Sequence, residues 1–181
     1  MNILVLGPQG SGKGTQAQRI KAMYGVPHIA TGDIIRQQME LMTELGREVK
    51  EVYDRGDLVS DELMIRLIRD RLSRGDTIGG FVLDGYPRTV DQAEALEKML
   101  KESARELDAV VSIVVAEDVV VERMLGRGRA DDSEEVIRNR MRVYREETEP
   151  LLEHYDGQVV AIDGVGSVEE VNARILQALG H

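Results

Sequence analysis

The chain has 181 residues, 42% hydrophobic and 31% charged, with a net charge of −10, which suits a single domain with a substantial core. The absence of cysteine excludes disulfides and cysteine-ligated zinc, and the acidic charge disfavours a nucleic-acid partner. No apolar run approaches the roughly 20 residues that cross a bilayer, and no basic leader begins the chain, so we expect a cytoplasmic protein without a membrane partner.

The first expected element is a short buried strand, Ile3–Leu6, which runs into the glycine-rich stretch of residues 7–15. Glycines allow backbone N–H groups to curl around a phosphate, and the helix that follows directs its positive dipole end at the same anion. Lys13 supplies a charge for the outer phosphates, and Thr15 supplies a hydroxyl one place later than in the strict pattern. The stretch predicts a nucleoside triphosphate site; a plain glycine-rich turn is the alternative.

Further apolar runs alternate with segments of helical periodicity. They lie at Pro27–Ala30, Phe81–Leu83, Val110–Val115 and Val159–Ile162. Continuous apolar strands that alternate with helices predict an α/β fold with a parallel sheet covered on both faces and ligands at the carboxyl ends of the strands. We expect helices to begin after Asp61, after Asp118 and at Asp131–Ser133.

Two segments do not fit the layers of the sheet. Residues 31–59 read as two short helices joined through Gly46, and residues 126–132 form a brief basic turn between helices. Both would project near the carboxyl ends of the strands. We therefore expect them to be the moving parts of the protein.

The strand at residues 81–84 ends in a carboxylate, Asp84, which could hold Mg²⁺ through waters or be an ordinary turn residue. Pro87 stiffens the turn that follows and aims Arg88, whose partner is either a phosphate or a structural carboxylate. Thr89 and Gln92 have the spacing of a capping box, in which Gln92 would reach back to the N-cap amide.

Arginines cluster later in the chain. Arg140 lies on a helix expected from about Ser133 to His154, beside an apolar stripe where a guanidinium needs an anion; Glu147 is one candidate. Arg123 and Arg127 are four residues apart and share a helix face. Arg129 follows them in the basic turn.

Together these segments resemble the adenylate kinases, members of the nucleoside monophosphate kinase family. The resemblance is carried by residues 7–15, Thr31–Asp33 with Arg36, Asp84–Arg88 with Gln92, Arg123 with Arg127, and Arg129–Asp132 with Arg140. The loop of that family reads Gly-Lys-Gly-Thr, which explains Gly14 and Thr15. The resemblance implies a P-loop three-layer fold with a five-stranded parallel sheet, and a core at about 1–29, 60–125 and 133–181. It adds a monophosphate-binding insert at about 30–59 and a short lid at about 126–132, without zinc.

The resemblance also implies roles for single residues. The donor ATP would be held by Gly10, Ser11, Gly12, Lys13, Gly14, Thr15, Arg123, Arg127 and Gly166. AMP would be held by Thr31, Arg36, Asp57, Leu58, Val59, Gly85, Tyr86, Pro87, Arg88, Gln92, Arg129 and Arg140. Catalysis would rest on Lys13, Arg88, Arg129 and Arg140, with Mg²⁺ held mainly by nucleotide and waters and contacted by Thr15 and Asp84.

The implied activity is reversible, Mg²⁺-dependent phosphoryl transfer from ATP to AMP, giving two ADP, by a monomer without a covalent intermediate. A UMP/CMP kinase of the same family is an alternative, but such enzymes usually carry a small residue in place of Thr31 and often Asn in place of Gln92. A GTP-binding switch is expected to carry an Asn-Lys-x-Asp signature, which this sequence lacks. Such a switch would also leave the arginine cluster unexplained. A non-catalytic nucleotide-binding module is the remaining alternative, but every motif residue needed for the chemistry is present.

Overall fold

A five-stranded parallel sheet forms the centre of the protein. The computed structural model describes residues 1–128 and 133–180. The strands are β1 (Asn2–Leu6), β2 (His28–Ala30), β3 (Phe81–Asp84), β4 (Ala109–Val114) and β5 (Val159–Asp163), in the order β2-β3-β1-β4-β5. The five-stranded parallel sheet expected from the apolar runs is confirmed.

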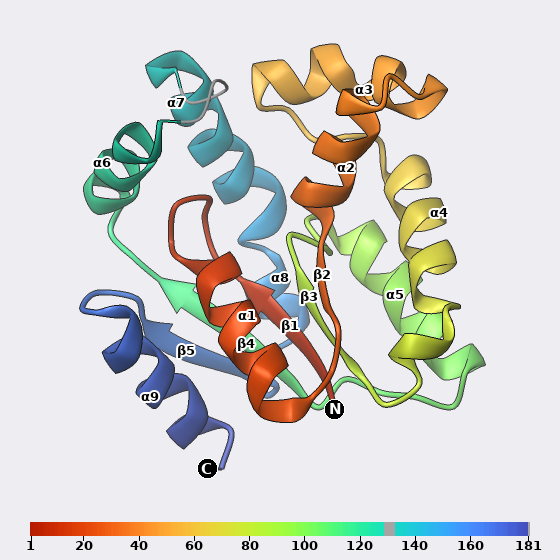
Figure 1. Ribbon diagram of the computed structural model, residues 1–181. Helices are drawn as coiled ribbons and strands as arrows, with labels where there is room; N and C mark the ends of the chain where they lie inside the picture. The colour runs from red at the N-terminus through yellow and green to blue at the C-terminus, as the bar shows by residue number, and fades with distance from the viewer. Residues whose placement is uncertain (129–132, 181) are drawn as a thin grey trace.

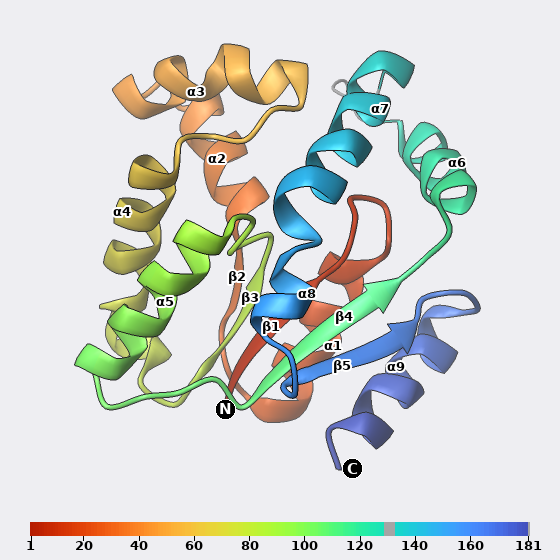
Figure 2. The same cartoon turned by 180° about the vertical axis from the view of Figure 1, so that it is seen from behind.

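Alternate residues of the buried strands face opposite layers, because successive side chains of a strand point to opposite sides. Ile3 and Val5 pack with α1 (Lys13–Tyr24) and α9 (Val168–Ala178), in front of the sheet in Figure 1. Leu4 and Leu6 belong to the core formed with α4 (Asp61–Leu72), α5 (Val90–Glu102) and α8 (Leu151–His154), which Figure 2 shows from the other side. The result is a three-layer α/β fold, as predicted.

Two helical pairs stand beyond the carboxyl ends of the strands (Figure 1). One pair is α2 (Thr31–Glu40) and α3 (Glu44–Arg55), and the other is α6 (Glu117–Arg127) and α7 (Glu134–Val143). The second pair has its own small apolar core of Val120, Met124, Ile137 and Met141. The described helices are each too short or too polar to span a bilayer.

The joint between α2 and α3 differs from the prediction. The helices meet at residues 41–43, and Gly46 lies inside α3. Thr43 is the N-cap of α3, and its hydroxyl accepts a hydrogen bond from the Gly46 N–H at 3.0 Å. A Cβ at residue 46 would lie 2.0 Å from the Gln38 carbonyl oxygen. Gly46 is therefore required by the close packing of α2 on α3, and it does not break the helix.

Two expected helix starts are displaced by one or two residues. Asp61 is the first residue of α4 with Ser60 as its N-cap, and α6 begins at Glu117, so Asp118 lies within its first turn. Carboxylates in a first turn are stabilised by the helix dipole, so they mark the same helix end without capping it. Ser133 caps α7 as predicted, and its hydroxyl accepts from the Val136 N–H at 3.3 Å.

The long helix expected over residues 133–154 is interrupted. It consists of α7, a π-helical turn at Tyr144–Thr148, and the short α8 after Pro150. A short 3₁₀ turn at Gly75–Thr77 precedes β3.

Candidate active site

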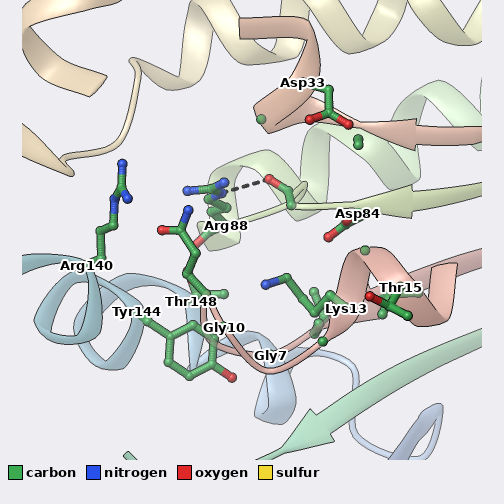
Figure 3. A pocket seen from close by; sticks show the side chains of 18 of the residues that line it. Gly7, Gly10, Lys13, Thr15, Asp33, Asp84, Arg88, Arg140, Tyr144 and Thr148 are labelled. Carbon is green, nitrogen blue, oxygen red and sulfur yellow. Dashed lines mark hydrogen bonds between the residues drawn. The ribbon is translucent and has the colours of Figure 1, made fainter. Parts of the chain in front are cut away.

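A cavity of about 550 Å³ opens at the carboxyl ends of the strands. Figure 3 shows Lys13, Arg88 and Arg140 around this hollow, with Asp33, Asp84 and Thr15 gathered at one side. The predicted site residues in its wall are Gly10, Gly12, Lys13, Gly14, Thr15, Arg36, Leu58, Asp84, Gly85, Pro87, Arg88, Arg123 and Arg140. The cavity thus unites residues from the phosphate loop, the α2–α3 pair and α7.

A second, smaller cavity of about 40 Å³ lies against α2 and α3. The predicted residues in its wall are Thr31, Asp57, Leu58, Val59, Gly85, Arg88 and Gln92. Leu58, Gly85 and Arg88 line both cavities. The cavity that holds the predicted donor residues therefore shares a wall with the cavity that holds the predicted acceptor residues, and Arg88 is part of this wall.

The phosphate loop is pressed against β4 and α6. Gly7 has φ +139°, and a Cβ there would lie 2.7 Å from the Ile113 carbonyl oxygen. Gly10 has φ +90°, and its Cβ would lie 2.7 Å from Cγ of the fully buried Met124. L-residues avoid such φ values, so the backbone keeps this shape only with glycine. The amine of Lys13 donates to the Pro8 carbonyl at 2.9 Å, across the loop.

Asp84 is a largely buried carboxylate in the wall of the large cavity. Its Oδ2 lies 3.4 Å from Nε2 of His28. Burial raises the pKa of Asp84, but the His28 hydrogen bond and the positive charge of Lys13 outweigh it and hold the pKa below its ordinary value. The carboxylate of Asp84 and the hydroxyl of Thr15 line one cavity, and oxygen donors of this kind are those that Mg²⁺ prefers. The residues present fit a magnesium ion held together with phosphates and waters.

Arg88 is held at three points. Its side-chain Nε donates to the Gly85 carbonyl at 2.8 Å, its backbone N–H donates to Gln92 Oε1 at 2.8 Å, and its carbonyl accepts from Thr148 Oγ1 at 2.9 Å. Burial lowers the pKa of Arg88, and the charge of Asp84 opposes that effect. A guanidinium stays protonated in proteins, so Arg88 is a fixed cation.

Gln92 does not complete the expected capping box. The Thr89 hydroxyl accepts from the Gln92 N–H at 3.2 Å, but Gln92 Oε1 accepts from Arg88, one residue before the N-cap. The reason is Asp61, whose carboxylate accepts from Gln92 Nε2 at 2.7 Å and from the Thr89 hydroxyl at 2.9 Å. Gln92 is 1% exposed, and its amide fastens Arg88 to α4.

Tyr53 of α3 lies between two cations, although the sequence gave no reason to assign it a role. Its hydroxyl accepts from Arg36 at 2.5 Å, and Arg36 also pairs with Asp33. Burial lowers the pKa of Arg36, but Tyr53 and Asp33 raise it more. The guanidinium carbon of Arg140, a residue only 8% exposed, lies 5.5 Å from the Tyr53 ring centroid, a cation–π distance.

Arg123 reaches the phosphate loop from α6. Its guanidinium donates to the carbonyls of Ser11 at 3.5 Å and of Gly164 at 3.1 Å. Gly164 precedes Gly166, which has φ +121°. Arg123 thus connects the loop to the turn after β5, where Gly166 was expected to contact the donor ATP.

Some predicted residues lie elsewhere. Among the described residues, Ser11, Tyr86 and Gly166 are outside the walls of both cavities. Tyr86 is fully buried, and its hydroxyl donates to the Gln92 carbonyl at 3.1 Å, so its position is that of a core residue. Arg129 and the side chain of Arg127 fall outside the described part of the structure. His28, Tyr144 and Thr148 line the large cavity although sequence reasoning gave them no role there.

A phosphate loop at the central strand of a parallel sheet, facing fixed arginines across a cavity, defines a P-loop nucleotide-binding protein. Residues 5–160 match the adenylate kinase family. The chain is 60% identical to an adenylate kinase of Nocardia farcinica, 53% to one of Rhodococcus erythropolis and 54% to one of a Mycobacterium species, each over 99% of both chains. The chain belongs to the adenylate kinase family.

Proposed function

We propose that the protein is an adenylate kinase that transfers the terminal phosphoryl group of ATP to AMP and yields two ADP. The observation that carries this proposal is the wall shared by the two cavities. Arg88 borders both the hollow at the phosphate loop and the smaller cavity at Thr31 and Gln92. A cation at this boundary can contact the transferring phosphoryl group and the acceptor phosphate together.

The donor half of the site is the phosphate loop with α1 and α6. Backbone N–H groups of residues 10–15 and the N-terminus of α1 bind the phosphates, with the amine of Lys13 on the outer ones. Arg123 lies beside the donor, Arg127 is assigned to the same half by the family resemblance alone, and the turn at Gly166 borders the donor base. Thr15 and Asp84 would contact, directly or through waters, a magnesium ion held mainly by nucleotide and waters, and the bound ion would supply positive charge to the phosphate oxygens.

The acceptor half is formed by α2, α3 and the segment 85–92. Thr31, Val59 and Gln92 border the smaller cavity, where the base is held. Arg36 and Arg88 bind the monophosphate. Asp57, Leu58, Gly85, Tyr86 and Pro87 shape the surroundings, directly or through the backbone. The amide of Gln92 and the hydroxyl of Thr31 favour adenine over a pyrimidine.

The chemistry needs no catalytic base. A phosphate monoester has a second pKa of about 6, so an AMP phosphate oxygen is already a nucleophile near neutral pH. It attacks the terminal phosphorus of ATP, the bond from that phosphorus to the bridging oxygen breaks, and ADP leaves with the electron pair. Lys13, Arg88, Arg129 and Arg140 neutralise charge on the transferring group, and positioning supplies the rest.

We assign the chain to three parts: a core of residues 1–29, 60–125 and 133–181, an insert of residues 30–59 and a short lid of residues 126–132. Closure of insert and lid over the nucleotides excludes water, which would otherwise accept the phosphoryl group. Small-angle scattering with and without a two-nucleotide inhibitor tests this; an unchanged radius of gyration contradicts closure. We further propose a cytoplasmic monomer, on family grounds, for which cell fractionation and gel filtration are the tests.

The function is tested by offering ATP and Mg²⁺ with AMP, UMP, CMP or GMP in parallel and separating the nucleotide products by chromatography. Strong ADP formation with AMP alone is expected, and it is expected to stop when Mg²⁺ is chelated. Preference for UMP or CMP would identify a pyrimidine nucleotide kinase with the same chemistry. Tight ATP binding without transfer to any acceptor would refute an enzymatic function.

A further inference from the structure

The helix that carries Arg140 widens into a π-turn next to the cavity. Tyr144–Thr148 is π-helical, and the Glu149 N–H donates to the Tyr144 carbonyl, five residues back, at 2.9 Å. In a regular α-helix, residues four apart drift by about 40° around the axis. The wider turn reduces this drift, and Arg140, Tyr144 and Thr148, spaced by four, all line the large cavity. π-Turns of this kind are frequent at functional sites.

The π-turn brings Thr148 to the backbone of Arg88. The Thr148 hydroxyl donates to the Arg88 carbonyl at 2.9 Å, although the two residues are 60 positions apart, and Thr148 is 7% exposed. The Arg88 N–H is held by Gln92 from α5 at 2.8 Å. Side chains from two different elements therefore fix the backbone of Arg88 at both its N–H and its carbonyl.

These bonds restrict the guanidinium as well. Arg88 Nε donates to the Gly85 carbonyl, and that carbonyl also accepts from the Thr31 hydroxyl, each at 2.8 Å. The turn of residues 85–88 is thus closed by the Arg88 side chain. It is also held by hydrogen bonds from Thr31, Gln92 and Thr148. If the Arg88 carbonyl loses its partner, a partly buried acceptor is unsatisfied, and the turn can shift to find another donor.

We propose that Thr148 is a positioning residue for phosphoryl transfer, whose hydroxyl holds the Arg88 carbonyl and so sets where the Arg88 guanidinium meets the phosphates. The inference rests on the proposed function, in which Arg88 contacts the transferring group. Catalysis by positioning is sensitive to displacements of about 1 Å. Loss of the Thr148 hydroxyl therefore lowers turnover more than it lowers nucleotide binding.

Thr77 provides a matched control. It is 1% exposed, and its hydroxyl donates to the carbonyls of Leu72 and Arg74, both at 2.8 Å. Thr77 precedes β3 and is absent from the walls of the described cavities. Thr77→Val and Thr148→Val thus remove the same kind of buried hydroxyl–carbonyl bond with the same change of shape, one remote from the site and one beside it.

The experiment compares wild type, Thr148→Val, Thr148→Ser and Thr77→Val by thermal unfolding and by steady-state kinetics with ATP and AMP. For Thr148→Val, kcat is expected to fall by on the order of tenfold, while both KM values stay within about threefold of wild type. Thr148→Ser keeps the hydroxyl and is expected to restore most of kcat. Thr77→Val is expected to lower Tm as Thr148→Val does and to keep kcat.

The outcomes separate this inference from the proposed function. An active wild type with an unaffected kcat in Thr148→Val overturns the role of Thr148 alone. So does a Thr148→Ser variant as impaired as Thr148→Val, or an equal loss of kcat in Thr77→Val. A wild type that transfers nothing to AMP overturns the proposed function and this inference with it. If Thr148→Val does not fold, Thr148→Ala is used instead. It removes the same hydroxyl without adding a methyl group in its place, and it carries the same expectation.

Discussion

Asn139 fastens the end of α3 to α7 through Asp57. Its side-chain amide donates to the Asp57 carboxylate at 2.7 Å and to the Arg55 carbonyl at 2.9 Å. The same junction is tight at Gly56, where a Cβ would lie 2.8 Å from Cγ of Arg140. The position of α3 and the position of Arg140 are therefore set together.

Asn139→Ala is expected to weaken AMP binding. The variant loses both hydrogen bonds to the end of α3, where Asp57 and its neighbours wall the smaller cavity. One or two bonds of this kind correspond to a rise in the Kd for AMP of about three- to tenfold, with the Kd for ATP little changed. Titration calorimetry measures both. Arg138→Ala is the control, because Arg138 pairs with Glu134 on its own helix; an equal effect there would refute a specific role of Asn139.

The Asp57–Asn139 bond is expected to depend on pH. The hydrogen bonds from Asn139 and then Arg55 lower the pKa of Asp57 below its ordinary value. A carboxyl whose pKa is lower in the folded than in the unfolded state stabilises the fold above the unfolded pKa of about 4, and this contribution is lost as pH falls through the folded pKa. The difference in free energy of unfolding between wild type and Asp57→Asn should therefore be largest near neutral pH and shrink below about pH 4. Urea titrations between about pH 3 and pH 7 measure it. A pH-independent difference would contradict the shifted pKa.

Arg88→Ala and Arg140→Ala are each expected to lower turnover by on the order of 10³ with the fold retained, because each removes a fixed cation from the transferring phosphoryl group. Steady-state kinetics and circular dichroism provide the measurements. Arg69→Ala is the matched control, since Arg69 forms an exposed pair with Glu102 at 3.1 Å, and exposed pairs contribute little. Near-normal turnover in the Arg88 and Arg140 variants would remove these arginines from the mechanism.

Thr31→Ala is expected to broaden the choice of acceptor. Thr31 is buried, lines the smaller cavity and donates its hydroxyl to the Gly85 carbonyl. Loss of the side chain enlarges the space for the base and removes a polar contact, so the ratio of kcat/KM for AMP to that for UMP should fall by on the order of tenfold. Thr31→Ser, which keeps the hydroxyl, should retain most of the ratio. The same ratio in wild type and Thr31→Ala would exclude Thr31 from specificity.

The strands and the glycine-rich loop could be predicted because both depend on local patterns. In the run that begins at Val110, the residues up to Ile113 are buried on both faces of the sheet, and the shape of the loop requires glycine at Gly7 and Gly10. The helix joint could not be predicted, because Gly46 is explained by its packing on Gln38 and not by a turn. Such a contact between two helices leaves no periodic signal in the sequence.

Part of the site depends on pairings between distant residues. Gln92 has the spacing of a capping box, but Asp61 is 31 residues away and takes its amide. The hydrogen bond between Thr148 and Arg88 depends on a π-turn, and no residue type in that segment predicts such a turn. Sequence reasoning therefore identified the charged groups that reach the cavity, but it missed Thr148 and the contacts by which Gln92 holds Arg88.

The contact of Gly10 with Met124 places a flexible side chain directly behind the phosphate loop. The loop has no spare room on that side, because even a methyl group at residue 10 would collide with the methionine. A loop that widens around phosphates must displace this side chain or α6 itself. Methionine is unbranched and changes conformation easily, so Met124 can adjust to a small shift of the loop. Val120, whose carbonyl and Cγ1 would lie 3.0 and 3.2 Å from a Cβ at residue 10, is β-branched and stiffer. Because Met124 and Val120 both belong to α6, a shift of the phosphate loop toward this side would be transmitted to α6 through these two residues.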